Sequence, residues 1–333
     1  MDFGVLAVPE PRRSARTARL LEELGFDTVL FPDSQNLAPE VWGQLMLAAQ
    51  ATTRVRLGPG VTNSVTRDPA VTASAALALQ AESGGRAVLG IGRGDSSVQR
   101  IGKREDRVAP FERYLAAVQR YLRGEVVDRD GFASRLEWLE RVQAPKVPVE
   151  VAATGPRVIE VAARHADAIC LAVGADPAHL GAVLAHARAA GRDPGALRYG
   201  AFVTAVIHDD VRVARDGVRG AAASFARFSA FAGSDLARLP APLAAAARYL
   251  REHYDMRHHT RTGVPHTAGI GDEFVDWFAI AGPPDVARER FGRLAALGLD
   301  FCHVIPGSTG MPREVATGSL QRLAGEVMPH LRG

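Results

Sequence analysis

The stretch "VRLGPGVTNSVTRDPAVTASAALALQAESGGRAVLGIGRGDSS", Val55 to Ser97, decides the fold. It holds two apolar runs, Val55–Val61 and Ala87–Ile91, and each run leads into small polar residues. The segment between them, residues 68–83, has the composition of an amphipathic helix. A buried strand, a helix and a second buried strand, in this order, predict parallel strands joined by a helical crossover.

The same alternation of strand and helix continues along the chain. We expect eight strands, at Phe3–Val8, Thr28–Phe31, Val55–Val61, Ala87–Ile91, Val147–Val151, Ala168–Val173, Ala201–Ile207 and Phe301–Ile305. The expected helices include Ser14–Leu24, Pro39–Ala51, Pro69–Glu82, Phe111–Arg123, Pro156–His165, Pro177–Ala190 and Arg313–Leu331. Eight such units predict an α/β fold, a (β/α)8 TIM barrel with insertions, rather than an open doubly wound sheet. The turn Val8-Pro9-Glu10-Pro11 also lacks the Gly-x-Gly-x-x-Gly pattern of a dinucleotide-binding fold.

Two segments are longer than ordinary loops. They are residues 124–145, after the fourth helix, and residues 209–283, between the seventh and eighth strands. We interpret both as insertions without a strand set of their own. Residues 1–333 are therefore expected to form a single barrel domain.

The composition excludes several classes of protein. Forty basic and 37 acidic residues give a net charge of +3, too small a surplus to indicate nucleic-acid binding. The only cysteines, Cys170 and Cys302, lie far apart in apolar runs, which argues against a disulfide framework and for a reducing cytoplasm. We expect no signal peptide, because the start Met1–Val5 lacks a basic region followed by an apolar one, and no membrane span, because no stretch of about 18 apolar residues occurs.

Polar residues follow several of the expected strands. Asp33-Ser34, Thr62-Asn63, Arg93-Gly94-Asp95 and Thr154-Gly155 would surround the mouth of the barrel, where the carboxyl ends of the strands form active sites. Glycines at 58, 60, 90, 92 and 94 are expected to let a flat ring approach the backbone closely.

These residues belong to a pattern that resembles the bacterial luciferase-like superfamily of flavin- and deazaflavin-dependent oxidoreductases. Within that superfamily, the sequence is most similar to the methylenetetrahydromethanopterin reductase branch. The matching pieces are Gly25–Val29 with Asp33, Ala51–Gly58, Gly60–Asn63, Arg67–Ala73, Ser83–Asp95 and Ala153–Pro156. The likeness is dense over residues 3–175 and weaker toward the end of the chain.

The resemblance implies a barrel that binds FMN or the deazaflavin coenzyme F420 at the carboxyl ends of its strands. It further implies a bulge in the third strand with a non-proline cis peptide, and Gly60–Val61 is the matching position. The implied cofactor-binding residues are Ser34, Gly60, Val61, Thr62, Asn63, Gly92, Arg93, Gly94, Asp95, Ala153, Thr154, Gly155 and Pro156. Asp33 and Asn63 are the candidates for catalytic polar contacts.

Several of these residues also have a plain structural interpretation. Asp33 could cap a loop, Asn63 could form an Asx turn, and Asp95 could cap a helix. Gly155-Pro156 opens a helix whose free N–H groups suit a phosphate, although proline is common at that position in any helix. The second strand of the family commonly ends in Asp-His, and here Ser34 replaces the histidine, which leaves the acid–base residue open.

Other residue groups are weaker candidates. Arg93, Lys103, Arg104 and Arg107 form a basic rim after the fourth strand, which could meet the acidic tail of the deazaflavin. The histidines of the long insertion are His253, His258, His259 and His266. A substrate contact or a solvated helix end is expected for them rather than a metal site, and no metal is expected elsewhere. Cys170 and Cys302 are expected in the core.

The preferred function is hydride transfer between coenzyme F420 and a small organic substrate at the barrel mouth. The alternative is a monooxygenase that uses reduced FMN supplied by a separate flavin reductase. A barrel kept as a structural or flavin-storage protein is a third interpretation. We expect a homo-oligomer that acts on a small molecule and binds neither nucleic acid nor membrane.

Overall fold

The computed structural model describes residues 1–141, 143–191, 195–230 and 239–332. Its contacts divide the chain into two compact units. The N-terminal unit comprises Leu6–Cys170 and Ala187–Arg198, and the C-terminal unit comprises Met1–Val5, Leu171–His186 and Tyr199–Gly333. The single domain expected for residues 1–333 stays a prediction.

The N-terminal unit is built on short strands that are mostly buried. They are β2 (Thr28–Phe31), β3 (Arg56–Pro59), β4 (Thr62–Asn63), β5 (Leu89–Gly92), β8 (Val149–Ala153) and β9 (Ala168–Leu171). The pairs β2–β3, β4–β5 and β5–β8 are parallel, and β9 neighbours β8. Every residue of β2 and β5 is buried, as is usual for parallel strands that are covered on both faces.

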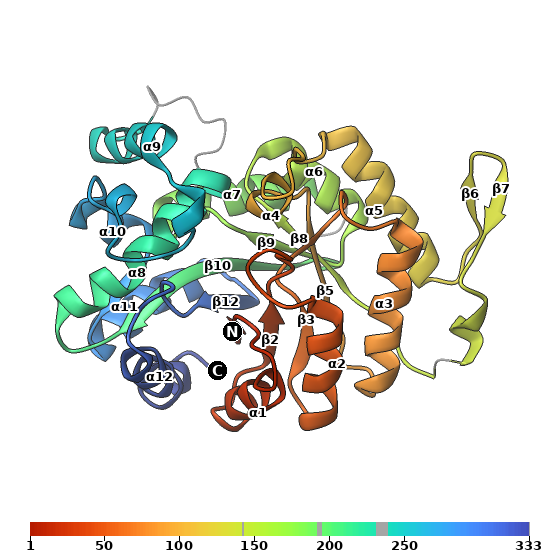
Figure 1. Ribbon diagram of the computed structural model, residues 1–333, viewed down its shortest axis with the longest axis horizontal. Helices are drawn as coiled ribbons and strands as arrows, with labels where there is room; N and C mark the ends of the chain where they lie inside the picture. Colours follow the sequence, from red (N-terminus) through yellow and green to blue (C-terminus); the bar gives the residue numbers. More distant parts are fainter. Residues whose placement is uncertain (142, 192–194, 231–238, 333) are drawn as a thin grey trace. The chain divides into compact units, whose positions relative to one another are not determined.

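Helices follow these strands and cover them. They are α1 (Ser14–Glu23), α2 (Val41–Ala51), α3 (Pro69–Glu82), α4 (Ser96–Gln99), α5 (Val108–Leu122) and α6 (Pro156–His165). The helices α1, α2, α3, α5 and α6 pack on one another in this order, and Figure 1 shows α2, α3 and α5 side by side along the strands. The carboxylate of Asp68 accepts from the Ala70 N–H over 2.9 Å, and Pro69 opens α3. These caps fix the start of α3 at the predicted residue.

The C-terminal unit contains four further strands. They are β1 (Asp2–Leu6), β10 (Arg198–Ile207), β11 (Ile280–Gly282) and β12 (Phe301–Ile305). Strand β12 pairs in parallel with both β1 and β10, and the end of β10 pairs in parallel with β11. Strand β11 is absent from the eight expected strands, because three residues are too few to form a recognisable apolar run.

The helices of the C-terminal unit surround a core of their own. They are α7 (Pro177–Ala190), α8 (Val211–Phe225), α9 (Ala241–His253), α10 (Asp272–Phe278), α11 (Pro284–Ala295) and α12 (Arg313–Arg322). Val206, Val218 and Phe274 are at most 1% exposed in this core.

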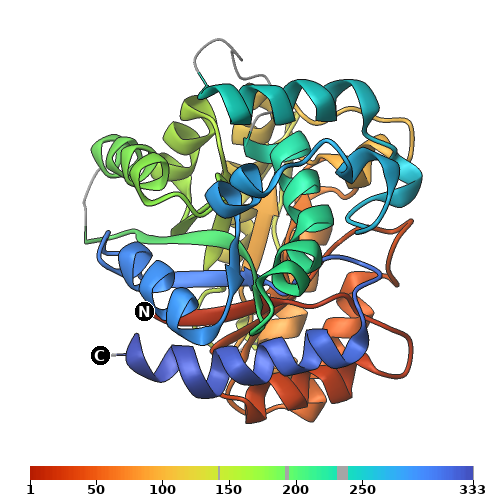
Figure 2. The same cartoon turned by 90° about the vertical axis from the view of Figure 1, so that its left-hand side faces the viewer.

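The last helix changes its hydrogen-bond pattern before the end of the chain. After α12 the chain forms a π-helix at Leu323–Val327 and a 3-10 turn at Met328–His330. Figure 2 shows α12 and these turns, in dark blue, as one continuous rod. The expected helix of residues 313–331 is therefore present in three parts. Elsewhere, 3-10 turns occur at Glu137–Arg141, Met256–His258 and Pro265–Thr267, and a π-helix at Ala226–Ala230.

The first insertion does contain strands, contrary to the expectation. Strands β6 (Val127–Arg129) and β7 (Phe132–Ser134) form an antiparallel hairpin, which projects away from the other strands in Figure 1. Asp130 and Gly131 connect them with φ angles of 54° and 87°, which is the Asp-Gly turn typical of two-residue hairpins. The second insertion also includes β11. Residue 142 of the first insertion and residues 231–238 of the second lie outside the described residues.

Candidate functional site

The predicted site residues all follow strands of the N-terminal unit. Strands β2 and β3 are parallel, β4, β5 and β8 are parallel, and Leu57 of β3 bridges in parallel to Ala87 just before β5. Their carboxyl ends therefore form one edge. The predicted residues at this edge are Asp33 and Ser34 after β2, Gly60 to Asn63 around β4, Gly92 to Asp95 at the end of β5, and Ala153 to Pro156 at and after the end of β8.

Asp33 is buried and already holds two partners. Its Oδ2 accepts from Thr62 Oγ1 over 2.7 Å and from Arg67 Nη1. Arg67 Nη2 also donates to Glu40 Oε1 over 2.9 Å. Asp33 therefore fixes the side chains of Thr62 and Arg67 at this edge. Ser34 lies in the turn that follows, where its carbonyl oxygen accepts from the N–H of Leu37.

The third strand is interrupted as the resemblance implies. Strand β3 ends at Pro59, β4 begins at Thr62, and the peptide bond between Gly60 and Val61 is cis. Beyond the interruption, Thr62 and Asn63 pair with Ile91 and Gly92 of β5.

Asn63 uses only one end of its side-chain amide. Its Oδ1 accepts from the N–H groups of Val65 and Thr66, each over 3.0 Å, and from Thr66 Oγ1 over 3.1 Å. The Asx-turn interpretation of this residue is therefore correct. Asn63 is 2% exposed, and within the described residues its Nδ2 has no hydrogen-bond acceptor. A buried donor without an acceptor is uncommon in folded proteins and indicates a group that a ligand or water completes.

The loop after β5 is tied to the loop after β4. Arg93 Nη1 donates to the Asp106 carbonyl over 2.7 Å, and the Asp106 N–H donates back to the Arg93 carbonyl over 3.0 Å. The carboxylate of Asp106 accepts from Ser64 Oγ over 2.6 Å. Arg93 thus ties the two loops together with one of its N–H donors, and its place in the expected basic rim stays a prediction.

Asp95 stands at the exposed side of the same loop. The loss of hydration among the surrounding protein atoms raises the pKa of its carboxyl. Ser96 Oγ donates to Asp95 Oδ1 over 3.1 Å and opposes this shift, whereas the nearby Glu105 carboxylate adds to it. Because Asp95 is exposed, solvent screening limits this shift.

Most of the mouth glycines serve the packing of the strands. A Cβ at Gly58 would lie 2.0 Å from the Val88 carbonyl oxygen, and one at Gly90 would lie 2.2 Å from the Pro59 carbonyl oxygen. At Gly60 and Gly94 the added atom would also meet protein atoms within 3.0 Å. Packing alone requires glycine at these four positions, and the expectation that they admit a flat ring stays a prediction.

The start of α6 is open, in contrast. A Cβ at Gly155 would meet nothing within 4 Å, and no side chain caps this end of the helix. Ala153 is buried at the end of β8, Thr154 is half-buried, and Pro156 is exposed. Free N–H groups and the positive end of the helix dipole make such a start suitable for a phosphate.

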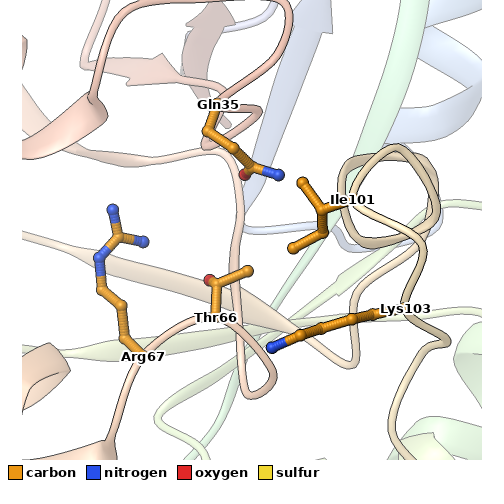
Figure 3. A pocket seen from close by; sticks show the side chains of 5 residues that line it. All are labelled: Gln35, Thr66, Arg67, Ile101 and Lys103. Carbon is orange, nitrogen blue, oxygen red and sulfur yellow. The ribbon is translucent and has the colours of Figure 1, made fainter.

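A pocket of about 270 Å³ adjoins these residues. Its lining residues are Gln35, Thr66, Arg67, Ile101 and Lys103 (Figure 3). Only Lys103 was a sequence candidate, as part of the basic rim. Arg67 is the first residue of Arg67–Ala73, one of the pieces that match the family pattern. Gln35, Thr66 and Ile101 lie in loops, where no sequence pattern identified them. Arg104 and Arg107 are exposed and do not line this pocket.

The histidines of the second insertion do not form a shared ligand set. His253 bonds to the Tyr249 carbonyl, His258 to Asp255, and His259 to the Tyr254 hydroxyl over 2.8 Å. Among the residues that the structure describes, no group of three or more His, Cys, Asp or Glu side chains could hold a metal ion. Cys170 and Cys302 are buried, as expected, and form no disulfide, and burial raises the pKa of the Cys302 thiol.

Comparison with known proteins gives a consistent result. The family model described as luciferase-like monooxygenase matches residues 2–300. The 5,10-methylenetetrahydromethanopterin reductase of Archaeoglobus fulgidus is 30% identical over 347 residues, with 100% of both chains covered. In the described part of the chain, no helix has the length and apolar character that crossing a membrane requires.

Two solved structures share the fold. The coenzyme F420-dependent tetrahydromethanopterin reductase of Methanopyrus kandleri has a TM-score of 0.77 at 21% identity, with 99% of each chain covered. An F420-dependent secondary alcohol dehydrogenase, solved with an F420–acetone adduct, has a TM-score of 0.75 at 17% identity, with 100% of this chain and 99% of that chain covered. These likenesses confirm the expected fold class, a luciferase-like (β/α)8 TIM barrel. The expected strands correspond to β1, β2, β3 with β4, β5, β8, β9, β10 and β12.

Proposed function

The chain belongs to the luciferase-like monooxygenase family, and from this premise we propose that it is an oxidoreductase that transfers a hydride between coenzyme F420 and a small organic substrate. The relatives support this assignment, since the reductase from Archaeoglobus fulgidus matches over the whole chain and two structural neighbours are F420-dependent enzymes. A reducing cytoplasm suits the proposal, because both cysteines are buried and neither forms a disulfide.

The observation on which the proposal chiefly depends is the buried Nδ2 of Asn63. Among the described residues it has no acceptor, and the carbonyl oxygen of a heterocyclic ring would complete it. The open start of α6 at Gly155 and Pro156 adds a site for a phosphate on the same edge. A ring with polar carbonyls and a phosphate is what FMN and F420 have in common, so the residues present fit either group.

When bound, the deazaflavin supplies hydride chemistry with little reaction toward oxygen, because a carbon replaces the flavin N5. The protein then has to orient the reactants and place a proton. Asp33 holds Thr62 and Arg67 in position through its Oδ2. Asp95 is an exposed carboxyl at this edge and is the candidate to exchange a proton, in place of the histidine that Ser34 replaces.

A monooxygenase that uses reduced FMN remains the second candidate, because the family description itself names that activity. It would require a flavin reductase as a partner. The side-by-side dissociation constants of F420 and FMN separate the two functions.

We expect F420 to bind at least tenfold more tightly than FMN. The variant Asn63→Asp keeps the acceptor of the turn and removes the Nδ2 donor, so the affinity for F420 should fall about tenfold. Gln321→Glu, the same amide-to-acid change at an exposed position of α12 far along the chain from these residues, is the control and should change affinity less than about twofold. Tighter binding of FMN, together with oxygen uptake in the presence of reduced FMN, would establish the monooxygenase instead.

A further inference from the structure

We propose that the pocket lined by Gln35, Thr66, Arg67, Ile101 and Lys103 is a subsite for a carboxylate group, with Lys103 as the cation that recognises it. All five residues belong to the N-terminal unit, and the pocket lies beside the residues assigned above to the cofactor.

The charge balance of the pocket favours an anion. Arg67 is matched by two carboxylates, since it donates to both Asp33 and Glu40. Lys103 is exposed, and no carboxylate in the described part of the chain forms an ion pair with it. The pocket therefore presents one uncompensated positive charge, and a carboxylate is the group that would neutralise it.

The polar walls of the pocket are held in place before any ligand arrives. Thr66 donates through its N–H and its hydroxyl to Asn63 Oδ1, and Gln35 Nε2 donates to the Ser97 carbonyl over 2.9 Å. In Figure 3 the amino group of Lys103 points toward Thr66, and the Arg67 guanidinium lies on the side opposite Ile101. Asp33 and Glu40 use two of the five N–H donors of Arg67, so further donors remain. Preformed donors lower the ordering cost of binding.

The volume of the pocket and its apolar wall at Ile101 limit the length and the chemistry of the ligand. A volume of about 270 Å³ is slightly below the range of pockets for drug-sized molecules, so it fits a short acid or the end of a longer ligand. Ile101 is 40% exposed and offers contact for the methylene groups beside the carboxylate. Two sources have this chemistry, namely the glutamate tail of the deazaflavin, which rests on the proposed function, and a carboxylate of the substrate.

The test compares Lys103→Gln with Arg104→Gln, the neighbouring exposed cation outside the pocket. Each variant and the wild type is titrated by calorimetry at low salt with three probes: F420 with its glutamate tail, the deazaflavin core without phosphate or tail, and glutarate. If the tail occupies the pocket, Lys103→Gln weakens tailed F420 about fivefold and leaves the core unchanged, and Arg104→Gln changes either less than twofold. If a substrate carboxylate occupies it, glutarate binds the wild type and Lys103→Gln weakens only glutarate, again about fivefold.

Equal effects of the two variants on every probe, or no effect of Lys103→Gln on any probe, would overturn the subsite. The fivefold difference should also shrink as salt rises, because exposed charges are screened. Melting temperatures of the variants verify that both are folded. Failure of the wild type to bind either deazaflavin would count against the proposed function alone, and the glutarate titration would still decide whether the pocket binds a carboxylate.

Discussion

In the N-terminal unit, the polar groups at the amino ends of the strands differ from those at the carboxyl ends in how fully the protein satisfies their hydrogen bonds. At the amino ends, Glu22 and Arg86 have almost every hydrogen-bonding group satisfied by the protein itself. At the carboxyl ends, Asn63 retains a buried donor without a described acceptor, the start of α6 has no side-chain cap, and Lys103 has no described ion pair.

The amino ends are closed by buried or half-buried charges that bind backbone groups. The Glu22 carboxylate accepts from the N–H groups of Thr53, Arg54 and Val55 just before β3, the Arg54 bond measuring 2.6 Å. Arg86 donates to the carbonyl oxygens of Ala49, Thr52, Val55 and Ser83 and to the Thr52 hydroxyl. These contacts join the loops before β3 and β5 to the ends of α2 and α3.

The difference indicates that the two ends of the strands in the N-terminal unit have different roles, one in stability and the other in ligand binding. Polar groups that the protein satisfies internally stabilise the fold, and polar groups left available at the opposite edge can bind a ligand without large cost to the fold. This agrees with the general placement of active sites at the carboxyl ends of barrel strands. Variants at the two ends should therefore separate stability from affinity.

The largest expected effect is at Arg86. Arg86→Met leaves four carbonyl oxygens without this donor, so the free energy of unfolding should fall by about 3 kcal/mol, measured by urea denaturation. Arg19→Met is the control, since Arg19 makes a single 3.3 Å bond to the Ala51 carbonyl and is exposed, and its effect should stay within about 0.5 kcal/mol. Similar losses of unfolding free energy in the two variants would contradict the view that the contacts of Arg86 stabilise the amino ends.

Glu22→Gln should destabilise the protein by about 2 kcal/mol at neutral pH, because hydrogen bonds to a charged group are replaced by weaker ones. Burial acts to raise the pKa of Glu22, but the N–H groups of Val55, Arg54 and Thr53 together outweigh it, so the pKa lies below the ordinary value of 4.5. A depressed pKa in the folded state gives stability that is present above pH 4.5 and is lost as the pH falls through the folded value.

The gap in unfolding free energy between the wild type and Glu22→Gln should therefore close as the pH falls below 4.5. Glu23→Gln, at the exposed neighbouring position, serves as the control. A gap that stays constant from neutral to acid pH would show that the carboxylate charge is not what stabilises this end.

At the opposite edge, Thr154→Glu places a negative charge beside the open start of α6. A cofactor phosphate bound there should lose at least tenfold in affinity, about 1.4 kcal/mol, while the free energy of unfolding stays within about 0.5 kcal/mol of the wild type. Thr154→Gln has nearly the same size without the charge and should bind almost normally. Unchanged affinity of Thr154→Glu would mean that the phosphate lies elsewhere.

The elements with strong local signals were predictable from the sequence. The helices at residues 69–82 and 156–165 match the structure at both ends, since Asp68-Pro69 and Gly155-Pro156 fix where they begin. Strand β11 and the hairpin of β6 and β7 were missed, although Asp130-Gly131 is a hairpin signal that could have been used.

The site was predictable only in part, for a physical reason. The sequence identifies residues that follow strands, but it does not say which polar atoms the protein satisfies internally. Asp33 bonds to Arg67, Arg93 bonds to Asp106, and the glycines at 58 and 90 are required by contacts between neighbouring strands. The lining of the pocket comes from loops that converge only in three dimensions.

The hairpin of β6 and β7 is a suitable place to insert a label or tag. Its base is anchored, because Arg129 pairs with Asp68 over 2.6 Å and the Tyr121 hydroxyl donates to Ser134 Oγ over 2.8 Å. Its tip is open, with Phe132 72% exposed beside the Asp130-Gly131 turn. Exposed turns with an anchored base tolerate inserted sequence. A fluorophore or affinity tag placed between Asp130 and Gly131 would thus give immobilised or labelled protein for the titrations, with both strand ends left intact.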